Sequence, residues 1–155
     1  MREKIEYDIV IVGGGPSGLA AAIKAKQLEP NLNILVLDKG SEIGAHILSG
    51  AVLDPVGLDK LIPDWRQTDI PVKTKVLEDN FFLLGPSGQI RIPSFFLPPL
   101  MGNHKNYIVS MGNVCRWLAQ YAENLGGDIF PGMSCNDLVF GGNGEVRGVV
   151  AGEFG

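Results

Sequence analysis

The 155-residue sequence has few cysteines and little positive charge. Its two cysteines, Cys115 and Cys135, are too few to hold a zinc ion or an iron–sulfur cluster, and they indicate no disulfide framework. The sequence contains 13 Lys and Arg and 17 Asp and Glu, so its formal net charge is −4. The basic residues form no run. Nucleic-acid binding needs clustered positive charge. We therefore predict neither a metal site nor a nucleic-acid partner.

Long hydrophobic runs are also absent. The longest uncharged stretches are 9–23, 43–53 and 92–103. None reaches the roughly 20 apolar residues that a membrane-spanning helix requires. The first eight residues mix acidic and basic side chains and lead directly into an apolar run, which is not the pattern of a signal or transit peptide.

Glycine, in contrast, is abundant, and its placement is informative. The apolar, β-branched run Tyr7–Val12 predicts a strand buried on both faces of a parallel sheet. It ends at a glycine-rich loop, an Ala-rich helix is predicted over 16–28, and Ile34–Asp38 predicts a second buried strand. This order predicts a β-α-β unit.

The loop contains Gly13, Gly15 and Gly18 in the spacing G-x-G-x-x-G. The first glycine permits a tight turn, the second lets the backbone approach a pyrophosphate, and the third lets helix and strand pack closely. Asp38 ends the second strand 20 residues after Gly18, where a carboxylate can accept the ribose hydroxyls of an adenosine. We predict a dinucleotide site, and FAD rather than NAD, because a long loop and an antiparallel insertion follow the second strand.

The predicted cofactor-binding residues share this loop, the end of the second strand, or a later helix. They are Gly13, Gly14, Gly15, Pro16, Ser17, Gly18, Asp38, Lys39 and Arg116. Two interpretations of Arg116 stay open, since it could lie near the pyrophosphate or be a solvated helix residue. No catalytic residue is identified, because a flavin carries the redox chemistry itself.

The predicted fold class is α/β, a glutathione-reductase-type FAD-binding Rossmann domain with a partial antiparallel β insertion. Residues 1–71 are assigned to the FAD-binding β-α-β unit and its following loop, and 72–110 to part of an incomplete quinone- or substrate-binding domain. Residues 111–155 return to the FAD domain with a helix, a strand and a hairpin. The sequence stops just after that hairpin, which we interpret as a truncation.

Four further segments are more distinctive than the glycine loop: Ile43–Pro55, Leu61–Trp65, Asn103–Ser110 and Gly112–Trp117. Together they resemble the N-terminal third of the electron transfer flavoprotein–ubiquinone oxidoreductases. The resemblance implies an enzyme that uses FAD and a [4Fe–4S] cluster to pass electrons from reduced electron transfer flavoprotein to ubiquinone. It also implies peripheral attachment to a membrane, here the cytoplasmic side of a bacterial inner membrane.

The sequence departs from this family in length. It has no counterpart of the four cluster cysteines, of the later Gly-Asp segment of the FAD site, or of most of the quinone domain. The cluster and ubiquinone are therefore expected only in a full-length member, and this length alone is expected to be inactive. Two alternatives are a geranylgeranyl-reductase-like or FixC-like flavoprotein, and an inactive fragment that needs a separate chain.

The resemblance also implies that 43–64 dips into the membrane near the quinone. The predicted membrane- or quinone-facing residues are Ile43, Ile47, Leu48, Val52, Leu58 and Leu61. The alternative is that this apolar face covers the protein's own core. A second apolar segment, Phe95–Met101, could line a quinone channel or form a buried crossover.

Overall fold

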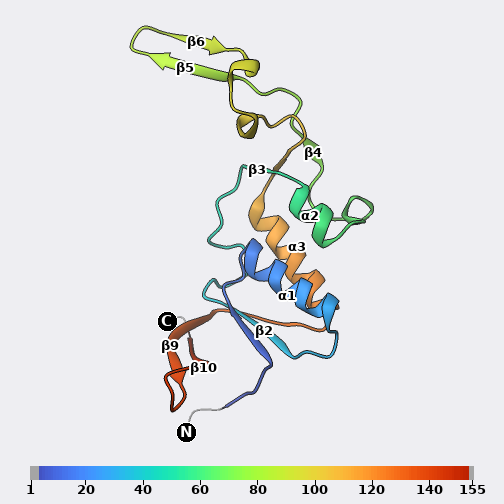
Figure 1. Ribbon diagram of the computed structural model, residues 1–155, viewed down its shortest axis with the longest axis vertical. Helices are drawn as coiled ribbons and strands as arrows, with labels where there is room; N and C mark the ends of the chain where they lie inside the picture. Colours follow the sequence, from blue (N-terminus) through green and yellow to red (C-terminus); the bar gives the residue numbers. More distant parts are fainter. Residues whose placement is uncertain (1–3, 154–155) are drawn as a thin grey trace. The chain divides into compact units, whose positions relative to one another are not determined.

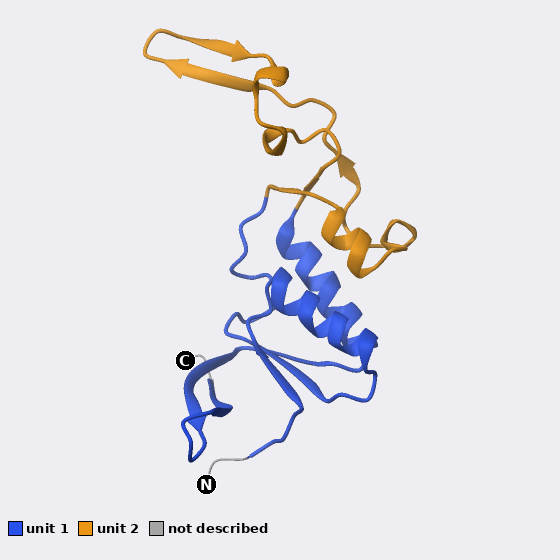
Figure 2. Ribbon diagram, viewed as in Figure 1, with its two compact units in different colours: residues 1–49, 110–155 blue, residues 50–109 orange. Residues whose placement is uncertain are grey.

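The computed structural model describes residues 4–153 and shows an α/β chain with two compact units (Figures 1 and 2). Unit 1 comprises Met1–Ser49 and Ser110–Gly155, and unit 2 comprises Gly50–Val109. The predicted domain boundary after residue 71 does not coincide with this division. Residues 50–71 fall in unit 2 because their strand, β3 (Ala51–Leu53), hydrogen bonds to β7 (Tyr107–Val109) near the end of the same unit.

Unit 1 is built on a parallel sheet with the strand order β1-β2-β8. The strands are β1 (Ile9–Val12), β2 (Ile34–Asp38) and β8 (Asp128–Pro131). In register, Val12 lies beside Leu37, and Leu37 lies beside Phe130. The predicted α/β fold with a parallel sheet and small antiparallel sheets is thus confirmed.

The central and the edge strand of this sheet differ in burial. The first four residues of β2 are all buried, as predicted for a strand inside a parallel sheet. The same prediction is wrong for β1, whose residues alternate and whose Val12 side chain is 56% exposed. Among the described residues β1 pairs only with β2, so it is an edge strand with one face uncovered.

Two helices pack against each other in unit 1, α1 (Pro16–Leu28) and α3 (Met111–Asn124) (Figure 1). The bounds of α1 are those predicted. Both helices direct small and branched apolar side chains inward, and their buried members include Leu19, Ala22, Ile23, Val114, Cys115, Leu118 and Ala122. The buried Lys26 closes the turn after α1, since its Nζ donates to the carbonyl oxygens of Pro30 at 2.6 Å and Leu32 at 3.0 Å.

An antiparallel hairpin ends the described part of unit 1. It consists of β9 (Met133–Phe140) and β10 (Val146–Glu153), and register shifts interrupt the ladder after Val146 and after Val150. The sequence predicts this hairpin around a Gly-Gly-Asn-Gly turn, with shorter strands than those observed.

Unit 2 contains short elements in two antiparallel sheets, ordered β3-β7-β4 and β5-β6. Its further strands are β4 (Thr74–Lys75), β5 (Phe81–Gly85) and β6 (Gly88–Ile92). Its helical segments are α2 (Val56–Leu61) and the 3-10 turns η1 (Trp65–Gln67), η2 (Ser94–Phe96) and η3 (Pro99–Met101). From short apolar runs and the turn residues between them, the sequence predicts strands around 81–84 and 89–92 and a short helix over 56–62, which correspond to the β5–β6 hairpin and α2. It does not predict β3 and β7, which are too short to show a periodic pattern.

The core of unit 2 is centred on the buried Trp65. Its indole ring meets Tyr107 edge to face at a centroid distance of 5.5 Å, and the Arg66 guanidinium lies 4.3 Å from the ring centroid. The indole Nε1 donates to Asp59 Oδ1 at 2.8 Å. Arg66 and Trp65 both hydrogen bond to Asp59, and these bonds lower the pKa of its carboxyl.

Candidate functional site

The loop between β1 and α1 needs two of its glycines for its own geometry. Gly13 has a φ of +112°, which side chains rarely adopt, and its N–H donates to the Leu37 carbonyl oxygen at 2.7 Å. A Cβ on Gly18 would lie far inside contact distance of the Gly13 carbonyl oxygen. Gly13 therefore makes the turn and Gly18 allows α1 to approach β1, as the sequence predicts.

Gly15 has a different role, because the packing around it leaves room for a side chain. It is the N-cap of α1 with an extended backbone (φ −80°, ψ 179°), and a Cβ there would meet no atom within 4 Å. No side chain caps the helix, and its first turn carries no acidic residue. The open space in front of Gly15 thus adjoins free N–H groups and the positive end of the helix dipole, which suits a pyrophosphate.

Asp38 joins this loop to the end of β2. Its Oδ2 accepts a hydrogen bond from the Gly14 N–H and its Oδ1 one from the Gly40 N–H, each at 2.7 Å. A carboxylate has about four acceptor positions, so both oxygens can still accept a hydroxyl. The carboxylate is half-buried beside the loop, as a ribose partner needs to be.

Gly14 is closed in from the other side by the loop after β2. A Cβ on Gly14 would clash with Ile43 Cδ1 and would lie 3.1 Å from Asp38 Oδ2. The prediction that Ile43 faces a membrane or quinone is therefore wrong for this structure, because its side chain is only 6% exposed and packs on the glycine loop.

A close backbone approach that the sequence analysis missed fixes the position of this loop. Gly44 has a φ of +85°, and a Cβ on it would lie 2.6 Å from the carbonyl oxygen of Gly112, at the start of α3. The only signal for this contact in the sequence is that two of the distinctive segments, Ile43–Pro55 and Gly112–Trp117, each contain one of these glycines. The contact holds the loop after β2 against the N-terminal turn of α3.

Arg116 reinforces the same junction. Its Nη1 donates to Glu42 Oε1 at 3.3 Å and to the Ile43 carbonyl oxygen at 3.4 Å, and its Nη2 donates to Asn113. It is thus more than a solvated helix residue, since it ties α3 to the loop that covers Gly14. A direct contact with a pyrophosphate stays a prediction. Lys39, Pro16 and Ser17 are exposed around the same opening.

Cys115 precedes Arg116 on α3, and its thiol is unreactive. It is fully buried in α3, and burial, the largest cause, raises the pKa of its thiol to about 11; Arg116 opposes the shift and Asp38 adds to it. The thiolate is the reactive form, so Cys115 is a protonated, inert thiol at neutral pH. Cys135 is only half-buried in β9.

We expect iodoacetamide to alkylate Cys135 and to spare Cys115 in the folded chain at neutral pH, while denaturant exposes both. Peptide mass spectrometry reads out each site. The Cys135→Ser variant is the control, and it should incorporate no label while folded. Labelling of Cys115 at the rate of Cys135 would contradict the buried position of the thiol.

The other residues predicted to face a membrane separate into three groups by burial. Leu58 is 6% exposed and lies in the core of unit 2, so its prediction is also wrong, whereas Ile47 and Leu61 are half-buried. Leu48 is 89% exposed and Val52 is exposed, and their membrane contact stays a prediction. The apolar face of α2 covers the core of unit 2. The i, i+3 pattern in the sequence predicts which side chains share a face, but it does not predict what covers that face.

The larger exposed apolar surface in unit 2 belongs to the hairpin and the loop after it. We call it the hairpin patch, and its exposed members are Phe81, Phe82, Leu83, Leu84, Ile90, Phe95, Phe96, Leu100 and Met101. Phe95 is 77% exposed and Leu100 fully exposed, so Phe95–Met101 is not a buried crossover. Between residues 4 and 153, no helix is both long and apolar enough to cross a membrane.

Comparisons with known proteins agree with this site. The family described as "NAD(P)-binding Rossmann-like domain" matches residues 11–66, which include the glycine loop and Asp38. An electron transfer flavoprotein-ubiquinone oxidoreductase from Pseudomonas aeruginosa is 46% identical over 99% of this chain. The chain resembles the N-terminal region of the electron transfer flavoprotein–ubiquinone oxidoreductases. The human mitochondrial electron transfer flavoprotein-ubiquinone oxidoreductase is 42% identical over 97% of the chain.

The chain spans only part of these oxidoreductases, 29% of the Pseudomonas protein and 25% of the human one. Among solved structures, a geranylgeranyl bacteriochlorophyll reductase-like protein from Thermoplasma acidophilum matches with a TM-score of 0.67 and 26% identity. That match covers 95% of this chain and 35% of the other. The resemblance predicted from the distinctive segments is thus confirmed, and the fold is that of FAD-dependent oxidoreductases.

Proposed function

We propose that this chain is the FAD-binding part of a flavoprotein that transfers electrons from reduced electron transfer flavoprotein to ubiquinone at a membrane surface. One observation carries the proposal: an open cradle at Gly15, beside Asp38, in a chain that matches electron transfer flavoprotein-ubiquinone oxidoreductases over 99% of its length. The bound FAD would supply the redox chemistry.

The residues of the cradle have distinct tasks in this proposal. Gly15 leaves room for the pyrophosphate at the N-terminus of α1, and Asp38 accepts from the ribose while it holds Gly14 in place. A carboxylate at this position also repels a 2′-phosphate, so NADP is disfavoured. Ile43 and Arg116 keep the loop after β2 closed over Gly14.

The test uses the complete product of the gene that encodes this chain. We expect it to bind FAD in preference to NAD, measured by quenching of flavin fluorescence, and to oxidise reduced electron transfer flavoprotein when a short-chain ubiquinone is present. Asp38→Ala should weaken FAD binding, because the variant loses the ribose partner and both bonds to the loop. Binding of NAD without FAD would contradict the cofactor assignment. FAD binding without oxidation of reduced electron transfer flavoprotein would contradict the assignment of that protein as the electron donor.

The membrane contact in this proposal is supported by the hairpin patch and not by 43–64. Every residue of β5 is exposed, and the four aromatic side chains of the patch are each more than a third exposed. Contiguous apolar surfaces of this kind mark interaction sites with proteins or membranes. We propose a lipid surface as the occupant because residues 81–103 carry no charge other than Arg91.

We expect the double variant Phe95→Ser, Phe96→Ser to bind phosphatidylcholine vesicles at least about tenfold more weakly than the parent, because each exposed ring that enters lipid contributes roughly 1.5–3 kcal/mol. Vesicle flotation measures the partition coefficient. Phe140→Ser is the matched control, since Phe140 is an exposed aromatic of unit 1 outside the patch. An equal loss of vesicle binding in the double variant and in Phe140→Ser would contradict the assignment of the hairpin patch as the lipid-binding surface.

A second function is favoured by the match to the Thermoplasma protein, whose name describes a geranylgeranyl bacteriochlorophyll reductase-like protein. A reductase of that kind would use the same FAD cradle but act on a prenyl chain. Activity with a geranylgeranyl substrate, and none with reduced electron transfer flavoprotein, would favour this alternative. The higher identity to the oxidoreductases over the same chain makes it the second choice.

A further inference from the structure

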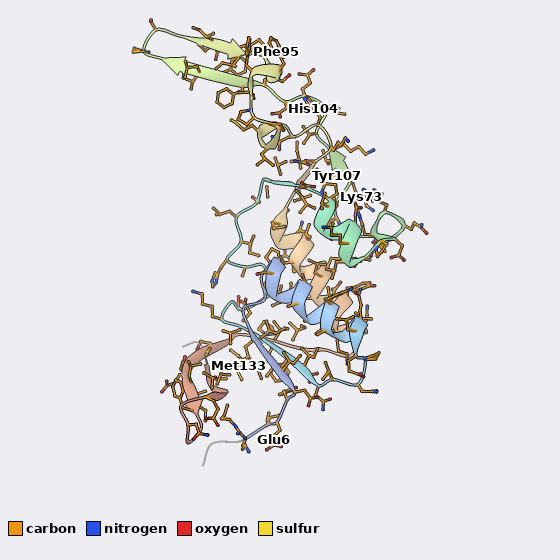
Figure 3. The ribbon with its side chains drawn as sticks, in the orientation of Figure 1. Glu6, Lys73, Phe95, His104, Tyr107 and Met133 are labelled. Atoms are coloured by element: carbon orange, nitrogen blue, oxygen red, sulfur yellow. The ribbon has the colours of Figure 1, made fainter. Side chains whose placement is uncertain are left out.

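Unit 2 contains a hollow of about 280 Å³ at the base of the β5–β6 hairpin. Its walls include the apolar side chains of Phe81, Phe95, Leu97 and Met101, and its polar members include Arg91 and His104. Figure 3 shows Phe95 at the base of the hairpin and His104 on the loop that follows. The hollow is thus formed by the hairpin patch and by the segment that returns from it to β7.

The hairpin and the loop after it have few ionisable side chains, and these line the hollow. Between residues 81 and 104 the only ionisable side chains are Arg91 and His104, and both line it. Within the part of the chain that the structure describes, neither forms an ion pair. A guanidinium with no ion-pair partner in a largely apolar hollow favours an anion with two acceptor oxygens, such as a phosphate.

Asp79 is the one acidic residue of the wall, and it is already engaged. Its Oδ2 accepts from the backbone N–H of Asn103 at 2.8 Å and from Asn103 Nδ2 at 3.3 Å. These bonds hold the loop that carries His104. Asp79 therefore serves the shape of the hollow, and within the described residues it forms no ion pair with Arg91.

We propose that the hollow binds the phosphate of an anionic phospholipid headgroup, one in which no ammonium group offsets the phosphate charge. Arg91 is the main donor to the phosphate oxygens, His104 is a second donor, and Phe81 and Phe95 contact the apolar part of the lipid. A lipid fits better than a soluble phosphate because the walls are apolar and the exposed rings of the hairpin patch adjoin them. The inference rests on the membrane contact proposed above and adds the chemical class of lipid that this contact selects.

The experiment compares two kinds of vesicle, pure phosphatidylcholine and an equal mixture of phosphatidylcholine and phosphatidylglycerol. We expect Arg91→Gln to reduce the partition coefficient on the mixed vesicles about fivefold, the factor typical of one basic residue at an anionic surface, and to leave binding to pure phosphatidylcholine unchanged. Arg91→Lys keeps the charge and should recover much of the loss. Lys60→Gln is the matched control, because Lys60 is an exposed cation of unit 2 outside the hollow.

Each outcome has a distinct meaning. An Arg91→Gln loss that is equal on both vesicles, or that Lys60→Gln reproduces, would overturn the selection of an anionic headgroup by the hollow. Glycerol phosphate added in solution should not release the chain from mixed vesicles, and release at low concentration would show a soluble phosphate as the ligand and overturn the lipid assignment. Failure of the Phe95, Phe96 variant to reduce binding would refute the membrane proposal itself, independently of Arg91.

Discussion

Gly15→Val is expected to weaken FAD binding by as much as about 100-fold while the chain stays folded. The valine side chain would enter the open space in front of α1, which the pyrophosphate needs, and its Cβ would meet no protein atom within 4 Å. Overpacking a close contact costs about 1–3 kcal/mol, which corresponds to as much as about 100-fold in the dissociation constant. Flavin fluorescence titration of the complete gene product measures this loss.

Thermal unfolding of the same variant separates binding from folding. Gly15 is the N-cap of α1 with an extended backbone that valine also adopts, so the change should cost no more than about 1 kcal/mol of stability without ligand. Normal FAD binding by the valine variant would show that the cradle is not the pyrophosphate site. A large fall in the melting temperature of the apoprotein would show that Gly15 is needed for packing.

Gly18→Ala is expected to have the opposite pattern, with its main effect on stability. The new methyl group would overlap the Gly13 carbonyl oxygen and would lie 3.2 Å from Ile11 Cγ2, and neither partner is the end of a flexible side chain. The helix and strand must then separate, at a cost of about 3 kcal/mol or more in the free energy of unfolding. Urea unfolding followed by circular dichroism measures it.

Gly57→Ala is the matched control for this change. Gly57 lies in α2, a Cβ there would meet no atom within 4 Å, and its backbone has no positive φ. Alanine in a helix is favoured over glycine by about 0.5–1 kcal/mol, so this variant should be slightly more stable than the parent. Equal stabilities of the two variants would show that α1 and β1 are not in close contact at Gly18.

The geometry of the glycine loop was predictable from the sequence because its determinants are local. A tight turn, a helix start and a close helix–strand contact each require glycine at a fixed distance from the strand end, and the order strand, loop, helix, strand is visible in the apolar pattern. What was not predictable is the way Asp38, Ile43 and Arg116 close the cradle. These contacts join positions that are 24 to 74 residues apart in the sequence.

The apolar segments show the limit of sequence reasoning most clearly. Ile43–Asp64 begins with an uncharged stretch and 81–101 is largely apolar, and the resemblance favoured the first as the membrane-facing segment. In the structure, Ile43 is covered by the glycine loop and Leu58 lies in the core around Trp65, whereas Phe95 and Leu100 remain uncovered. Composition states how much apolar surface a segment has, but only its neighbours decide whether that surface meets protein or solvent.

The sequence by itself determined the β-α-β unit, the roles of Gly13 and Gly18, and the resemblance to the oxidoreductases, because all of these depend on residue types at short, fixed spacings. The tertiary structure decided the pairing of β3 with β7, the exposed edge of β1, and the contact between Gly44 and Gly112. It also decided which apolar side chains remain outside and gathered Arg91 and His104 into one hollow. These features depend on which distant segments meet, and spacing along the chain does not encode that.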